Sequence, residues 1–462
     1  MSQSDDIVIV ESTTVAEKAT ENVAEKTTNV YREQRIASSG MGFLLQQMRT
    51  STTSNSVSVA KKRKLEEDVA QPEVKKARVQ PIAVEYPLLN KECVGELKCE
   101  LVQTIRDCYN EGTTPKFNFA KDCGENNFVR SCKFSPTGTH LITESADRRV
   151  RIFDFKDDKL DLKKSILNGD LIYDMIWDRF GENFATASGG SPIKLWNTDG
   201  QQMATYHGIN HMDELDFAHA LAFDFNGEKL YATYRGVLRR FDVNRPGAQI
   251  SEIKTFDSMQ LGQKSILSCI EMSPAMQGVY AIGSFGAGVG LYSDFTNSCD
   301  TVVPTQSRFI TCLQYSSDGQ RLFVGSRKSS VIECFDVRNF AKSLAQYSRP
   351  VTNGQRVYLR VDPSDRYMFS GSTSGDIRIF DLANASATNT VVEPTWMISN
   401  ASKSTVAGLD IHPSEPFIAT THGQRVFPMP LNDENDEADI PDKNQYLGLT
   451  EGFDNSLKLW KF

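Results

Sequence analysis

The chain has 462 residues and a formal net charge of −8, and 39% of its residues are hydrophobic. Such a chain can bury a large core, and its charge excludes sequence-independent coating of nucleic acid by a positive field spread over the whole molecule. The nine cysteines show no CxxC spacing, so we expect free or buried thiols in a reducing compartment rather than disulfides. No apolar run approaches the length of a membrane span and no signal-peptide pattern opens the chain, which predicts a soluble intracellular protein.

Residues 1–112 differ in composition from the rest of the chain. Up to about residue 80 they are rich in Ser, Thr, Glu, Lys and Val and poor in aromatic residues. Such a segment cannot bury enough apolar surface to offset the conformational entropy that folding would remove. We therefore predict a disordered N-terminal tail over 1–112.

Two basic clusters lie within this tail. They consist of Lys61, Lys62, Arg63, Lys64, Lys75, Lys76 and Arg78. Their spacing resembles a bipartite nuclear localisation signal, in which basic side chains pair with acidic grooves on an import receptor. The alternative is a solvated charge run, and the acidic residues Glu66, Glu67 and Asp68 between the clusters partly favour it. We predict that the clusters direct nuclear import.

A short motif around one aromatic residue recurs through the remainder of the chain. It reads RIFD, KLWN, RRFD, GLYS, ECFD, RIFD and KLWK, with the aromatic residue at Phe153, Trp196, Phe241, Tyr292, Phe335, Phe380 and Trp460. Most neighbouring motifs lie about 43 to 51 residues apart, near the length of a four-stranded propeller blade. Alternating apolar residues between them indicate antiparallel strands, and clusters of Pro, Gly and Asp indicate hairpin turns. The pattern predicts an all-β, seven-bladed β-propeller over residues 113–462.

The seventh unit is the most irregular. A long insertion, which contains the acidic run NDENDEADIPD (432–442), separates its second predicted strand, 416–421, from its third, 457–460. Its fourth strand must come from another part of the chain, and we predict that TPKFNFAK (114–121) supplies it. That pairing would cover the open sheet edge and close the ring.

Basic and aromatic residues interleave in the loops that we predict to line one rim of the ring. This rim is formed by the loops between consecutive blades and by those joining the second and third strands of each blade. The predicted RNA-contacting residues are Arg148, Arg149, Arg235, Lys264, Phe285, Arg308, Phe309, Arg327, Lys328, Arg356 and Arg425, and Tyr234 belongs to the same predicted rim. Cations there could pair with phosphates, and flat rings could stack on unpaired bases. The alternative for each residue alone is an ordinary loop cation or an aromatic wedge between blades.

The repeated motif resembles the WD repeat, although FD, WN, YS and WK replace its eponymous Trp–Asp pair. Phe in place of Trp keeps an aromatic wedge but lacks the indole N–H donor. Five further segments resemble the telomerase Cajal body protein 1 family. They are HGINHMDELDFAHALAF (207–223), GQKSILSCIEMSP (262–274), YAIGSFGAGVGLY (280–292), FSGSTSGDIRIFD (369–381) and GQRVFPMP (423–430).

This resemblance implies a seven-bladed WD-repeat propeller that recognises the CAB-box loop of box H/ACA small Cajal body RNAs, and telomerase RNA where that RNA carries the box. It also implies partners among H/ACA ribonucleoprotein proteins such as dyskerin and among nuclear-body proteins. The expected location is the nucleus, in Cajal bodies or an equivalent nuclear body. Guide-RNA binding is the safer part of this expectation, because telomerase RNAs diverge between organisms.

The residues indicate neither an enzyme nor a cofactor site. His207 and His211 form HxxxH, which would place two metal ligands on one face of a helix, but we expect them in a loop between blades. No readable motif places a nucleophile beside a base, so we predict a non-catalytic protein without metal or cofactor. The alternative to RNA binding is a propeller scaffold whose rim binds peptide tails of nuclear proteins without direct RNA contact.

Overall fold

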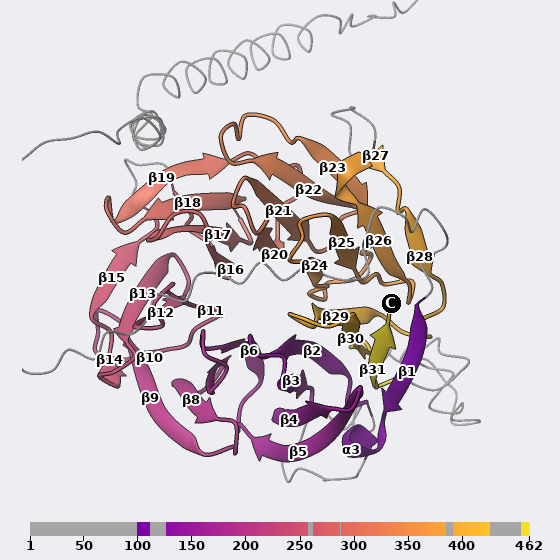
Figure 1. Cartoon of the computed structure of the whole chain (residues 1–462). Coiled ribbons are helices and arrows are strands. Elements are labelled where there is room, and N and C mark those ends of the chain that lie inside the picture. The colour runs from indigo at the N-terminus through magenta and orange to yellow at the C-terminus, as the bar shows by residue number, and fades with distance from the viewer. Residues whose placement is uncertain (1–98, 111–125, 257–261, 287, 385–390, 426–453) are drawn as a thin grey trace, which may run out of the picture. The chain divides into compact units, whose positions relative to one another are not determined.

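A computed structural model of the chain describes residues 99–110, 126–256, 262–286, 288–384, 391–425 and 454–462. In these residues, seven mainly antiparallel sheets follow one another around a ring (Figure 1), which confirms the predicted all-β, seven-bladed propeller. None of the helices in the described part of the chain is long and apolar enough to span a membrane. The basic clusters at 61–64 and 75–78, the segment 114–121 and the acidic run 432–442 lie outside the described residues.

Blades 1 to 4 each contain a four-stranded antiparallel meander, numbered from the strand that lines the centre of the ring. Blade 1 consists of β2 (Val129–Phe134), β3 (His140–Ser145), β4 (Arg149–Lys156) and β5 (Lys159–Leu167). Blade 2 consists of β6 (Ile172–Trp177), β7 (Asn183–Ser188), β8 (Ile193–Asn197) and β9 (Gln202–Ile209), extended by β10 (Leu215–Asp216) and β14 (Gly247–Ala248). Blade 3 consists of β11 (Ala220–Phe223), β12 (Lys229–Thr233), β13 (Val237–Asp242) and β15 (Ser251–Lys254). Blade 4 consists of β16 (Leu267–Met272), β17 (Val279–Ser284), β18 (Val289–Ser293) and β19 (Ser298–Val303).

Blades 5 to 7 keep the same plan, and the last of them takes a strand from the N-terminal side. Blade 5 consists of β20 (Ile310–Tyr315), β21 (Arg321–Ser326), β22 (Val331–Asp336) and β23 (Ala345–Ser348), extended by β27 (Val391–Val392). Blade 6 consists of β24 (Leu359–Val361), β25 (Tyr367–Ser370), β26 (Ile377–Asp381) and β28 (Trp396–Ile398), with the 3-10 helix η1 (Leu382–Asn384) after β26. Blade 7 consists of β29 (Val406–Ile411), β30 (Phe417–His422), β31 (Leu457–Lys461) and β1 (Glu100–Ile105), and the short helix α3 (Asp107–Asn110) follows β1.

The repeated aromatic residues are buried between neighbouring blades. Phe153, Phe241, Tyr292 and Phe380 have no exposed surface, and the two tryptophans of the motif, Trp196 and Trp460, are also buried. Both indole N–H groups donate to a threonine hydroxyl of the same blade, at 3.0 Å from Trp196 to Thr186 and at 2.8 Å from Trp460 to Thr420. The phenylalanines also pack between the blades, but they lack this hydrogen bond. Burial of each aromatic ring stabilises the fold by about 2 to 3 kcal/mol, because apolar surface is removed from water.

Inner and outer strands differ in sequence because they meet different surroundings. All six residues of the inner strand β29 are buried, since both of its faces pack against neighbouring blades. The outer strand β5 is mostly exposed and buries only Leu160 and Ile166, because its outer side meets water. The turn between β2 and β3 requires Gly138, whose φ is 76° and whose Cβ position would lie 2.4 Å from atoms of the His412 ring. That close approach packs a turn of blade 1 directly against blade 7.

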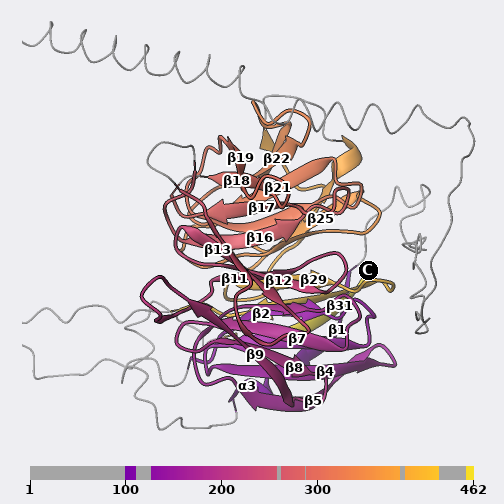
Figure 2. The ribbon, with the colours of Figure 1, turned by 90° about the vertical axis from the view of Figure 1, so that its left-hand side faces the viewer.

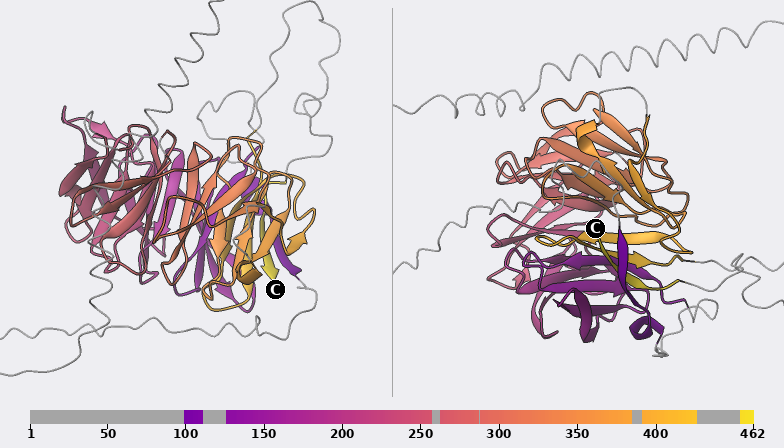
Figure 3. Two further views of the ribbon diagram at one scale, coloured as in Figure 1. Left: turned by 90° about the horizontal axis from the view of Figure 1, so that it is seen from above. Right: turned by 45° about the vertical axis from the view of Figure 1, so that its right-hand side comes forward.

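The ring is closed by β1, and the prediction that 114–121 supplies this strand is wrong. Strand β1 pairs antiparallel with β31, from Glu100 opposite Lys461 to Ile105 opposite Leu457. The two strands lie side by side in Figure 1 and in the right-hand view of Figure 3. The ring therefore includes residues on the N-terminal side of the boundary predicted at residue 113. The sequence ELVQTI concealed this role, because an outer strand is largely exposed and carries little apolar periodicity.

Contacts beyond the sheet anchor this segment to blade 1. The Gln103 side-chain amide donates to the Leu160 carbonyl at 3.0 Å, and its carbonyl accepts from the Leu160 N–H at 2.8 Å. In α3, the Tyr109 hydroxyl hydrogen-bonds to the Thr143 hydroxyl at 2.8 Å. The segment 100–109 therefore holds the first and last blades together.

We expect Gln103→Ala to lower the free energy of unfolding by about 2 to 3 kcal/mol, because it leaves both backbone groups of Leu160 without their side-chain partner. Urea denaturation followed by tryptophan fluorescence measures the change. Val102→Ala is the matched control on the same strand, where the side chain is 38% exposed. Equal stability of the two variants would show that the hydrogen bonds of Gln103 do not help to hold the first and last blades together.

Candidate nucleic-acid interface

The predicted rim residues lie at one face of the ring. Arg148, Arg235, Phe285 and Arg327 lie in the loops between the second and third strands of blades 1, 3, 4 and 5. Another group, Lys264, Arg308, Phe309 and Arg356, lies in the loops that lead from one blade to the next. In an antiparallel meander these two kinds of loop emerge at the same end of the strands. Figure 2 shows the ring from the side, with its loops at two opposite faces.

Three of these residues form a compact group, which we call the arginine–phenylalanine cluster: Phe285, Phe309 and Arg327. The Arg327 guanidinium carbon lies 4.0 Å from the centroid of the Phe285 ring and 5.4 Å from that of Phe309. The ring centroids are 6.1 Å apart with an interplanar angle of 59°. A further bond at 3.2 Å from Arg327 Nη1 to the Gly354 carbonyl orients the guanidinium. The cluster thus combines a cation with two aromatic rings at the protein surface.

Backbone and electrostatic features set this cluster apart from ordinary loop residues. Phe309 has a φ of 62°, which is unfavourable for an aromatic residue, and its side chain is 45% exposed. Such strain persists only where the surroundings impose it, and it is common at binding sites. Burial lowers the pKa of the Arg327 guanidinium, and the charge of Arg356 lowers it further. The region is therefore short of negative charge and would favour an anion.

Four exposed basic residues extend this cluster along blades 3 to 5. We call them the basic arc: Arg235, Lys264, Arg308 and Lys328. Their side chains form no hydrogen bond or ion pair with other residues that the structure describes. The Lys264 ammonium lies 5.4 Å from the centroid of Phe256, a ring that is 39% exposed. Sequence reasoning missed Phe256 because it follows an outer strand, and only its closeness in sequence to Lys264 could have indicated it.

Other predicted rim residues already have partners within the protein. Arg148 donates to the Gly169 carbonyl at 3.1 Å, and Arg149 donates to the Ser165 hydroxyl at 3.5 Å. Tyr234 has no exposed surface and lies beneath the Arg239 guanidinium, 4.2 Å from the ring centroid, so its ring does not line the rim. Arg425 is exposed at the end of a described segment. The structure therefore concentrates the available cations over blades 3 to 5.

Arg356 lies across the mouth of the central channel. It donates to the carbonyl of Tyr173 in blade 2 at 3.4 Å and to that of Ser268 in blade 4. It also donates to the Tyr358 hydroxyl at 3.1 Å, and its Nη1 lies 3.7 Å from the Asp174 carboxylate. Burial opposes the charge of Arg356, but Tyr358 and Asp174 outweigh it, so its pKa is raised. One side chain from the loop before blade 6 therefore links blades 2 and 4 across the ring.

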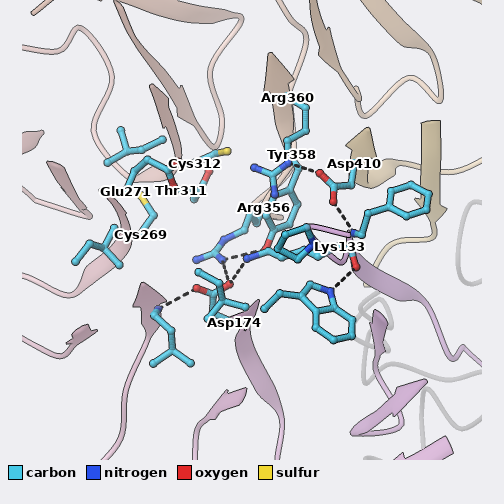
Figure 4. Close-up of a pocket in the computed structure, with 17 residues that line it drawn as sticks. Lys133, Asp174, Cys269, Glu271, Thr311, Cys312, Arg356, Tyr358, Arg360 and Asp410 are labelled. Carbon is cyan, nitrogen blue, oxygen red and sulfur yellow. Dashed lines mark hydrogen bonds and ion pairs between the residues drawn. The ribbon is translucent and has the colours of Figure 1, made fainter. Parts of the chain in front are cut away.

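Arg356 and side chains of the inner strands, several of them charged, line a cavity of about 310 Å³ (Figure 4). Lys133 pairs with Asp174 at 3.2 Å, and Arg360 pairs with Asp410 at 2.6 Å. Glu271 lies in the wall, where burial raises its pKa to about 7 although Arg360 and Lys133 lower it. Sequence reasoning did not single out these residues, but polar side chains within otherwise apolar inner strands were the available signal. The ion pairs neutralise most of the channel charge and join blades 1, 2, 6 and 7.

The residues that the structure describes contain no group of three or more His, Cys, Asp and Glu side chains able to hold a metal ion. His207 lies within strand β9 and not in the predicted inter-blade loop, and His211 follows in a turn. The HxxxH spacing therefore spans a strand end, where it does not place both rings on one helical face. The seven cysteines of the described residues are all free thiols.

The seven blades and their buried aromatic residues define a WD-repeat β-propeller, and residues 118–154 match the family model described as WD domain, G-beta repeat. The chain is 33% identical over 354 residues to Telomerase Cajal body protein 1 of Mus musculus, and 34% identical over 336 residues to that of Homo sapiens. The chain belongs to the telomerase Cajal body protein 1 family. These alignments include 72% and 68% of this chain and 66% and 61% of the relatives' lengths.

A relative with a different name aligns over a similar part of the chain. Guanine nucleotide-binding protein negative regulator 1 of Schizosaccharomyces pombe is 27% identical over 371 residues, which are 72% of this chain and 88% of that protein. Its alignment thus extends over most of that protein's length.

We expect Arg356→Gln to lower the free energy of unfolding by about 2 to 4 kcal/mol, because glutamine cannot reach blades 2 and 4 together and leaves buried acceptors without a donor. Arg308→Gln is the control, since this exposed arginine has no partner among the described residues, and its effect should stay within about 0.5 kcal/mol. Chemical denaturation at neutral pH measures both. Equal losses of stability in the two variants would contradict the conclusion that Arg356 stabilises the ring by linking blades 2 and 4.

Proposed function

We propose that the chain is a non-catalytic RNA-binding propeller that recognises a short unpaired RNA loop, the CAB box of box H/ACA small Cajal body RNAs. The observation that carries the proposal is the arginine–phenylalanine cluster, in which Arg327 lies 4.0 Å from one ring and 5.4 Å from a second ring at an exposed rim. Unpaired bases stack on aromatic and guanidinium planes, and this contact is available only to RNA that is not held in a helix.

The basic arc complements the cluster. A strand whose bases stack on the rings of Phe285 and Phe309 would carry its phosphates along neighbouring rim loops, where Arg308 and Lys328 are exposed. The net charge of −8 does not oppose this, because salt screens surface charges beyond about 8 Å and leaves local cations to act on their own. Arg148, Arg149 and Arg356 contribute less in this proposal, since each already bonds to protein groups.

The names of the relatives associate the family with telomerase and Cajal bodies. We propose that this chain directs H/ACA ribonucleoproteins to Cajal bodies or an equivalent nuclear body and supports telomerase where its RNA is a client. H/ACA proteins such as dyskerin and nuclear-body proteins are the proposed protein partners. Nuclear import through Lys61–Lys64 and the cluster at 75–78 remains a prediction, because both lie outside the described residues.

A protein-binding scaffold is the second candidate function. The relative named as a negative regulator of a guanine nucleotide-binding protein favours it, because that name describes action on a protein. The charged channel favours it as well, since Glu271 and Arg360 could meet a peptide inserted along the axis. The two functions differ in their response to ribonuclease, which would release partners bound through RNA and leave peptide complexes intact.

We expect Phe309→Ala to weaken binding of an RNA hairpin with a CAB-box loop by about 5- to 150-fold, since stacking of one base contributes about 1 to 3 kcal/mol. Fluorescence anisotropy of the labelled hairpin, beside one with a scrambled loop, measures the change. Phe225→Ala is the matched control, because Phe225 is 54% exposed at the opposite rim and lies under Arg179 at 4.1 Å. Equal loss in both variants, or equal binding of both hairpins, would overturn the proposal.

We expect the affinity for the same hairpin to fall with salt, with a slope of log K against log salt of about −3 for four phosphate contacts. The double variant Arg308→Gln, Lys328→Gln should flatten that slope by about 1.4, because it removes two of them. The control carries the same charge change at the opposite rim, Arg245→Gln with Arg338→Gln, and should keep the original slope. A slope near zero for the parent protein would favour the scaffold function instead.

A further inference from the structure

A second aromatic pair, Tyr173 and His219, lies at the rim, outside the set of residues that the sequence predicted to contact RNA. The rings of Tyr173 and His219 are stacked, with centroids 5.4 Å apart and an interplanar angle of 28°. Tyr173 is the second residue of β6, and His219 directly precedes β11. Both residues therefore lie where a loop between blades meets an inner strand. Both side chains are partly exposed, whereas the aromatic wedges between blades are buried.

The surroundings of this pair hold it rigidly. A Cβ at Gly189 would lie 2.4 Å from the Tyr173 hydroxyl oxygen, so the ring packs directly against the backbone of the neighbouring loop. The backbone N–H of His219 donates to the Thr233 carbonyl at 2.7 Å, and this bond fixes the backbone that carries the imidazole ring. Burial lowers the pKa of His219, Asp216 raises it in part and Arg356 lowers it, so the imidazole is neutral at neutral pH. A neutral, flat ring is well suited to stack on a base.

Arg356 connects this pair to the arginine–phenylalanine cluster. It donates to the Tyr173 carbonyl at 3.4 Å, and its charge lowers the pKa of both His219 and Arg327. Arg356 therefore lies close to both aromatic groups, at the mouth of the channel between blades 2 and 5. Arg327 contacts the first pair of rings, and Arg356 bonds to the backbone of the second pair.

We propose that Tyr173 and His219 form a second base-stacking platform, which extends the RNA site from blades 4 and 5 across the channel mouth to blades 2 and 3. The ligand class is a single strand of several unpaired nucleotides, whose bases stack on the aromatic rings at both ends. This inference rests on the proposed function, because it requires that the first cluster also binds RNA. It predicts a minimum strand length that one platform alone would not impose.

The test uses the full chain and labelled single-stranded RNAs that carry the CAB-box sequence, with flanks that extend their length from about four to about ten nucleotides, and anisotropy is the readout. In the parent protein, affinity should rise as the strand becomes long enough to reach the second platform. His219→Ala should bind the shortest strands as the parent does and the long strands about tenfold more weakly. His219→Phe, which keeps a flat ring, should restore the gain with length, and unchanged thermal unfolding of both variants would exclude a loss of fold.

The alternative outcomes separate this inference from the proposed function. If His219→Ala matches the parent at every length, or weakens all lengths equally, the second platform is wrong, while loss of binding in Phe309→Ala would still support the first cluster. If the parent binds no strand, or if Phe309→Ala binds as the parent does, the proposed function itself is overturned. Tyr173→Leu provides an independent check, since it removes the other ring and leaves the carbonyl that Arg356 uses.

Discussion

The pairing of β1 with β31 is the constraint on which the rest of the ring depends. A propeller blade that ends with its third strand leaves an open edge of unpaired N–H and C=O groups, and the first and last blades then meet only through side chains. Here five registered pairs between 100–105 and 457–461 cover that edge. Gln103 and Tyr109 carry the contact onward into blade 1. This pairing closes the ring of blades, and the relative positions of the rim loops depend on that closure.

Charged side chains line the centre of the ring together with apolar ones. Inner strands converge on a channel where Lys133, Asp174, Arg360 and Asp410 form ion pairs, and Arg356 spans the mouth above them. Buried ion pairs add little net stability over apolar residues, but removing one partner is costly because the other charge remains. Such pairs therefore specify how blades are oriented more than they stabilise the fold, and Arg356 couples that orientation to the rim.

The distribution of partners decides which rim cations can bind a ligand. Arg148, Arg149 and Arg356 bond to protein oxygens, whereas Arg308 and Lys328 are exposed and have no partner among the described residues. Phe285 and Phe309 add two rings to the second group, so the cations that a ligand can reach lie over blades 3 to 5 beside an aromatic surface. An acidic protein can thus present a local cationic surface, because screening confines each charge to its neighbourhood.

The sequence by itself determined the number of blades and the strands within them, because the spacing of seven aromatic motifs and the alternation of apolar residues are local signals. It also identified the rim loops and, among their residues, Phe285, Phe309 and Arg327. Only the tertiary structure decided that β1 and not 114–121 closes the ring, that Tyr234 is buried and that Arg356 crosses the channel. It alone brought Tyr173 beside His219. These features depend on pairing and packing between residues that are far apart in the chain, and the local sequence around one residue does not indicate which distant residue it will contact.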